Sequence, residues 1–160
     1  MHPLLPTLGW REWLALPDLG IAGIKAKVDT GARSSALHAF GIEPFDRGGR
    51  AMVRFRVHPW QHNTEQTVAA EAELIGHRLV RNSGGTETLR PVIVTSARLF
   101  DECWPIEITL IARDAMGFRL LLGREAVRRR FLVDASRSFL AGKRPPDVPR
   151  TPRRNERKSP

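Results

Sequence analysis

The chain has 160 residues, of which 41% are hydrophobic and 27% charged, a composition typical of one soluble globular domain rather than of a disordered chain. A single cysteine, Cys103, excludes an intramolecular disulfide framework, and the apolar runs are too short to span a bilayer. No basic leader precedes an apolar stretch near the N-terminus. We therefore expect a cytoplasmic protein with no signal peptide and no membrane partner.

The positive charge is concentrated near the C-terminus. The whole chain carries 26 basic and 17 acidic residues, a net charge of +9, and residues 141–160 contribute seven of the basic and two of the acidic residues. This stretch also holds five of the twelve prolines and no apolar side chain larger than valine, so it cannot bury enough surface to offset its ordering entropy. We predict a folded domain over residues 1–140 and a disordered basic tail over 141–160.

The tail is interpreted as a solubilising extension, with attraction to RNA, ribosomes or acidic proteins as the alternative. Without it, the domain has a net charge of only +4, from 19 basic and 15 acidic residues. A nucleic-acid partner is therefore not the expectation for the domain itself.

Apolar and polar residues alternate along most of the domain, a pattern that predicts strands with one buried face. Turn residues separate these segments, and their spacing predicts an all-β fold, a closed antiparallel barrel. The alternating segments are 24–28, 53–57, 68–74 and 106–110, with turns at 17–20, 47–49, 62–63 and 82–85.

Only one segment predicts a helix, from Arg124 to about Arg130. It is short, and the basic residues at its C-terminal end suit the helix dipole. Strand-like segments at 131–134 and 138–140 follow it and close the predicted domain.

The segment with the clearest chemistry is Asp29-Thr30-Gly31, at the end of the alternating segment 24–28. In an aspartic protease, glycine at such a position lets backbone amides approach the carboxylate, and the threonine hydroxyl can brace the loop against its mate. Two loops related by a two-fold axis place two carboxylates around one water, so that one activates the water while the other protonates the carbonyl oxygen. The triplet alone is a weak signal, because all three residues are common in turns.

The context of the triplet makes the signal specific. Val28-Asp29-Thr30-Gly31-Ala32, followed much later by Leu121-Leu122-Gly123-Arg124, resembles the retropepsins. More closely, the chain is similar to a bacterial retropepsin-like endopeptidase family that has been labelled "ATP-dependent zinc protease". The resemblance covers about residues 8 to 141, and its further shared segments are 9–13, 25–33, 35–37, 90–93, 105–110 and 116–124.

The resemblance implies an acid-protease barrel in which Asp29 is catalytic, Thr30 braces the loop and Gly31 allows the backbone to approach. It also implies a partnership with ATP-grasp ligases that append glutamate to proteins. The sequence contains no second copy of the triplet, since Val133-Asp134-Ala135-Ser136 lacks the glycine. We therefore predict a homodimer with one Asp29 from each subunit. The alternative is a monomeric relative whose Asp29 merely caps a turn.

Residues near Asp29 in the sequence suggest how a peptide substrate binds. Lys25 and Lys27 share the strand parity of Asp29, and Arg33 follows four residues later. We take Lys27, Ala32 and Arg33 as substrate-binding candidates. Lys25, Lys27 and Arg33 are predicted to form a basic rim that attracts acidic or glutamate-rich peptides; the alternative is a solvated strand face. The loop 58–65 is the preferred candidate for a mobile flap over the site, and 82–86 is the alternative.

The sequence predicts no cofactor and no metal. His58 and His62 are four residues apart, but Pro59 argues against a helix that would bring them to one face. The glycines at 20 and 23 lack P-loop spacing. Cys103 is expected to be a packed structural residue. The alternative to an enzyme is a non-catalytic β-barrel module that docks on RNA, a ribosome or a modifying ligase.

Overall fold

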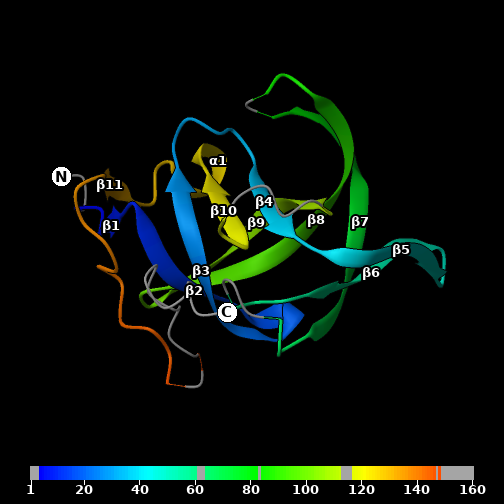
Figure 1. Cartoon of the computed structure of the whole chain (residues 1–160), viewed down its shortest axis with the longest axis horizontal. Helices are drawn as coiled ribbons and strands as arrows, with labels where there is room; N and C mark the ends of the chain where they lie inside the picture. Colours follow the sequence, from blue (N-terminus) through cyan, green and yellow to red (C-terminus); the bar gives the residue numbers. More distant parts are fainter. Residues whose placement is uncertain (1–3, 61–63, 83, 113–116, 147, 149–160) are drawn as a thin grey trace, which may run out of the picture.

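The computed structural model describes residues 4–60, 64–82, 84–112, 117–146 and 148. In this part of the chain, strands predominate and a single short α-helix follows the tenth strand (Figure 1). The prediction of a mostly β fold with one helix is confirmed. The elements are β1 (Thr7–Gly9), β2 (Arg11–Leu16), the 3₁₀ turn η1 (Pro17–Leu19), β3 (Ile21–Asp29), β4 (Ser35–His38), β5 (Phe40–Arg47), β6 (Arg50–Val57), β7 (Val68–Arg81), β8 (Glu87–Leu99), β9 (Glu102–Ile111), β10 (Leu120–Gly123), α1 (Arg124–Val127) and β11 (Leu132–Asp134).

Nine strands form one sheet in the order β2-β3-β10-β4-β9-β8-β7-β6-β5, while β1 and β11 pair separately. Three pairings are parallel, namely β3 with β10, β4 with β9 and β1 with β11, so the prediction of a purely antiparallel sheet is wrong. Long stretches of chain, not hairpin turns, join the strands of these pairs, and no tight turn forces them to run in opposite directions.

The sheet curves until β2 meets β8, but the two strands pair only at Ala15 and Arg98. In the described part of the chain, the predicted closure of the barrel thus depends on this one residue pair between β2 and β8. At the other end of the order, β5 is the edge strand of the sheet.

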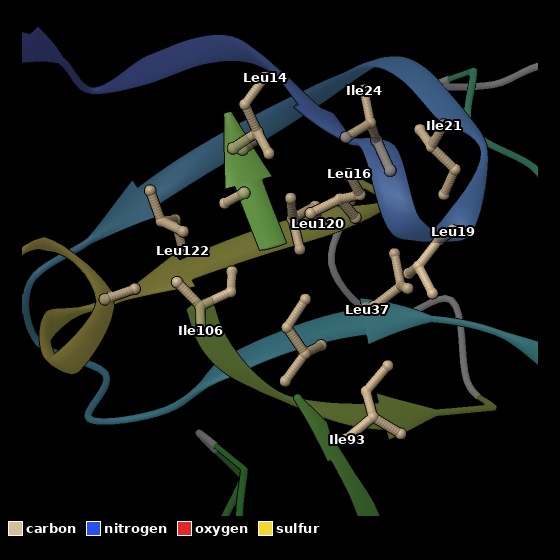
Figure 2. Close-up of a cluster of buried hydrophobic side chains, with 14 of the residues drawn as sticks. Leu14, Leu16, Leu19, Ile21, Ile24, Leu37, Ile93, Ile106, Leu120 and Leu122 are labelled. Carbon is tan, nitrogen blue, oxygen red and sulfur yellow. The ribbon is translucent and has the colours of Figure 1, made fainter. Parts of the chain in front are cut away.

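The core is formed by aliphatic side chains from both ends of the domain, and Figure 2 shows Leu14, Leu16, Ile24, Leu120 and Leu122 gathered between the strands. Each side chain of this size contributes about 1.5–3 kcal/mol when it is fully buried. The alternation predicted for residues 53–57 is confirmed, because Val53, Phe55 and Val57 are all buried.

The same alternation explains an incorrect expectation on β9. Trp104 and Ile106 are buried, so the strand turns Cys103 to the opposite face, where it is exposed. The expectation of a packed cysteine is therefore wrong.

The first residues of the predicted tail pack on the domain. A Cβ at Gly23 would lie 2.5 Å from Cγ of Pro145, and Val148 is buried. The disorder of residues 149–160 stays a prediction, because they lie outside the described residues. Among the described residues, no helix combines the length and apolar character needed to cross a membrane.

Candidate active site

The two segments that carry the resemblance lie side by side. β10 runs parallel to β3, with Leu122 opposite Val28 and Gly123 opposite Asp29. Strand β3 thus ends in Asp29 at the same level at which β10 ends in its glycine. The chain then turns away from β3 through residues 30–34 and enters β4 on the other side of β10.

Gly123 is required by a close approach of two backbone segments. A Cβ at this position would lie 2.4 Å from the carbonyl oxygen of Ser34, which is far inside van der Waals contact. The amide of Gly123 donates to Oγ of Ser35 at 3.0 Å, and this bond is buried. The loop after Asp29 is therefore held directly against the end of β10.

The carboxylate of Asp29 is oriented by its own loop. The amides of Gly31 and Ala32 donate to Oδ1 at 3.0 and 3.2 Å. A Cβ on Gly31 would lie 3.3 Å from the same oxygen, so the glycine leaves room for this approach. Backbone amides that converge on one carboxylate oxygen fix the direction of the carboxylate. Asp29 remains half-buried, and its carboxylate is not sealed in the core.

Sequence reasoning missed Arg124 as a residue of the site. Its amide donates to the carbonyl of Ala32 at 2.7 Å, and its Nη1 donates to the carbonyl of Thr30 at 3.1 Å. The next amide, of Glu125, donates to the carbonyl of Arg33. The first residues of α1 thus hold three carbonyls of the Asp29 loop. Its position directly after Gly123 was the available signal in the sequence.

The other predicted site residues lie around the loop. Thr30 and Gly31 are exposed, as is Arg33, whereas Ala32 is half-buried. Lys27 is exposed on the face of β3 that also carries Asp29, because Ala26 and Val28 point into the core. The roles assigned to these residues stay predictions.

Lys25, by contrast, belongs to a packed cluster. Its Nζ lies 5.3 Å from the ring centroid of Trp13, and the ring of Phe139 is at 6.0 Å. Burial lowers the pKa of Lys25 below its ordinary value, and the nearby charge of Arg11 lowers it further.

A hollow of about 310 Å³ lies beside the Asp29 loop, and Arg33 and Ser34 form part of its wall. On the other side, Arg78 of β7 donates to Oγ of Ser34 at 3.2 Å and pairs with Glu107 at 2.8 Å. The long hairpin β7–β8 is therefore tied to the loop that contains Asp29. In Figure 1 the far end of this hairpin curves over toward the loop between β3 and β4.

This contact favours the alternative flap candidate, residues 82–86, since they join β7 to β8; residue 83 lies outside the described residues. The preferred candidate, 58–65, falls partly on residues 61–63, which lie outside the described residues. Its first residue, His58, packs its ring at a tilt against that of Phe40 of β5, with 4.5 Å between the ring centroids. No group of three or more potential metal ligands is found in the part of the chain that the structure describes.

Comparison with known proteins identifies the family. The family model of the retropepsin-like aspartic endopeptidase RimB matches residues 7–144. The chain belongs to the RimB-like family. A crystal structure of a Legionella pneumophila protein of unknown function aligns with this RimB-like chain at a TM-score of 0.69 and 29% identity, covering 85% of this chain and 98% of the other.

Longer proteins contain a region similar to this RimB-like chain. A probable alpha-L-glutamate ligase of Shewanella pealeana is 42% identical over 137 residues, which are 86% of this chain and 30% of that protein. One from Parasynechococcus marenigrum is 47% identical over 135 residues, 84% of this chain and 29% of that protein. The chain thus spans less than a third of the length of these relatives.

Proposed function

We propose that this chain is an aspartic endopeptidase in which Asp29 from two subunits forms the catalytic dyad. The observation that carries the proposal is the geometry of the Asp29 loop, in which two amides orient the carboxylate while β10 and α1 hold the backbone behind it. Membership of the RimB-like family supports the same reaction class.

In the proposed mechanism, two Asp29 carboxylates flank a water molecule across the dimer axis. The two share one proton, so the ionised carboxylate accepts a proton from the water as it attacks the peptide carbonyl, and the protonated carboxyl group donates its proton to the carbonyl oxygen. The pair then protonates the departing amine. Gly31 permits the amide approach that keeps each carboxylate in place, and the Thr30 hydroxyl braces the two loops against each other.

The proposed substrate is a protein or peptide that lies between the Asp29 loops and the β7–β8 hairpin, which acts as the flap. Lys27 and Arg33 place exposed positive charge on either side of Asp29 in the chain. Ala32 lies beside them in the loop and would contact the peptide backbone. This charge favours acidic segments, including glutamate-modified ones.

An ATP-grasp glutamate ligase is the proposed partner. The similarity to part of longer proteins named probable alpha-L-glutamate ligase supports a link between the two activities. The ligase reaction itself is not proposed for this chain, which matches less than a third of those proteins.

The second candidate function is a non-catalytic binding module. It is favoured by one observation, that the sequence contains a single Asp-Thr-Gly triplet and a monomer therefore has no dyad. Such a module would dock on a ligase, a ribosome or RNA through its basic surface.

Asp29→Asn tests the proposed reaction, with Asp101→Asn as the control because Asp101 is exposed and lies in the turn between β8 and β9. Cleavage of a glutamate-tailed protein and of its tail-free version is followed by mass spectrometry. We expect Asp29→Asn to lower kcat at least 1,000-fold and the control to stay within twofold. If Asp29→Asn cleaves as fast as the wild-type protein, the dyad is refuted. If the wild-type protein cleaves both substrates at equal rates that do not depend on salt, the acidic preference is refuted.

A further inference from the structure

The β7–β8 hairpin carries two arginines directly opposite each other. Arg78 on β7 pairs in register with Arg90 on β8. Residues directly opposite in an antiparallel pair project from the same face of the sheet, about 5 Å apart at Cβ, and two like charges there destabilise the pair. This arrangement calls for a compensating negative charge.

The shared face of the two arginines looks toward the candidate active site. Arg78 reaches Oγ of Ser34, which belongs to the chain segment that leads away from Asp29. Arg90 lies on the same face, so its side chain projects from the hairpin toward the side on which the Asp29 loop lies.

The two arginines differ in how their charge is balanced. Arg78 pairs with Glu107 at 2.8 Å. Arg90 is only 8% exposed, and its Nε donates to Oγ1 of Thr88, a neutral partner. Among the described residues, no carboxylate forms a salt bridge with Arg90. Burial lowers the pKa of Arg90, although a guanidinium stays protonated at physiological pH.

A buried charge with only a neutral partner is costly, and a ligand that supplies the opposite charge would offset this cost. The five donors of a guanidinium match the two oxygens of a carboxylate in a planar, bidentate arrangement. In a cleft that receives a peptide, the available planar anions are an acidic side chain and a C-terminal carboxylate.

We propose that Arg90 is a specificity-determining residue that binds a carboxylate of the peptide substrate beneath the β7–β8 hairpin. This inference rests on the proposed function, because it takes the ligand to be a peptide held between the hairpin and the Asp29 loop. Arg78 fixes the hairpin against that loop, and Arg90 selects for a negative charge on the bound peptide.

Binding rather than cleavage provides the primary test. In full-length protein carrying Asp29→Asn, which prevents turnover, the Kd of an acidic peptide is measured by calorimetry with and without Arg90→Met. A series of peptides of one parent sequence is compared. It contains the parent with all its glutamates and the variants in which one glutamate at a time is replaced by glutamine, each with a free and with an amidated C-terminus. Arg81→Met is the matched control, because Arg81 lies on β7 of the same hairpin, with the parity opposite to that of Arg78, and pairs with Glu87 at the surface.

We expect Arg90→Met to raise the Kd of the acidic peptide about tenfold and to leave that of one glutamine peptide, or of the amidated peptide, unchanged. The peptide whose affinity becomes insensitive to Arg90 identifies the side-chain or terminal carboxylate. Arg90→Lys should recover part of the affinity, and Arg81→Met should change it less than twofold.

An equal loss of affinity for acidic, neutral and amidated peptides would show a structural role for Arg90 and overturn the proposal. If Arg90→Met does not fold, the peptide series is measured with Arg90 unchanged. The proposal is then overturned if neither amidation nor any single glutamate replacement weakens binding more than twofold. Charge-selective binding without any cleavage by the wild-type chain would instead refute the proposed reaction and leave the subsite standing.

Discussion

At the scale of single residues, the chain places one carboxylate where water does not reach. Glu12 is fully buried, and it accepts the amides of Gly9 at 2.6 Å, Leu140 at 3.0 Å and Ala141 at 2.9 Å. These three donors come from the last residue of β1 and from the C-terminal segment. A single side chain thus joins the two ends of the domain, and none of the described basic residues forms a salt bridge with it.

Replacing Glu12 with glutamine tests this connection. The amide retains one acceptor oxygen but turns an NH₂ group toward backbone donors, so at least one buried amide loses its partner. We expect a decrease of about 3 kcal/mol in the free energy of unfolding, measured by urea denaturation. Glu102→Gln, at an exposed position, should change it by less than about 0.5 kcal/mol; a similar small effect for Glu12→Gln would contradict the structural assignment.

At the scale of elements, α1 is a single helical turn that holds the Asp29 loop in place rather than an independent helix. It has only four residues, ends at Val127, and is shorter than the helix predicted to run to about Arg130. Arg129 adopts a φ of 67°, in the left-handed region, which no α-helix can continue through. The function of this turn lies in its first residues, which bond to the carbonyls of the Asp29 loop.

Arg124→Met removes the guanidinium bond to the carbonyl of Thr30 and keeps the backbone bond to Ala32. The Asp29 loop then loses one constraint, and we expect kcat to fall about tenfold with KM within twofold, since positioning acts mainly in the transition state. The thermal midpoint is measured alongside. Arg128→Met, which loses only a surface pair with Glu125, is the control. A change in KM alone would contradict a role in positioning the carboxylate.

At the scale of the whole molecule, one chain provides one Asp29 loop, and the proposed dyad therefore requires two chains. Activity should depend on subunit concentration, because dilution dissociates the dimer. We expect specific activity to fall steeply below the dimer dissociation constant, at the concentration where sedimentation velocity shows monomers. A specific activity that is constant across that range would favour a catalytically complete monomer or a binding module.

The fold could be predicted in part. Period-two alternation identifies buried faces, as at Val53 and Phe55, because side-chain direction in a strand is a local property. Strand direction is not local when the partners are far apart in sequence, and the parallel pairing of β3 with β10 was therefore missed. Barrel closure depends on the summed twist of many strands, and here it amounts to the pair Ala15 and Arg98.

The sequence by itself determined the family, since the Asp29 triplet and the Gly123 segment are recognisable as patterns of residues. Only the tertiary structure decided what surrounds them. Two contacts join residues that are distant in the chain, namely the bond from Arg124 to Thr30 and the bond from Arg78 to Ser34. The burial of Arg90 likewise depends on the tertiary structure. Such contacts depend on how strands are ordered across the sheet, and no local pattern of residue types encodes that order.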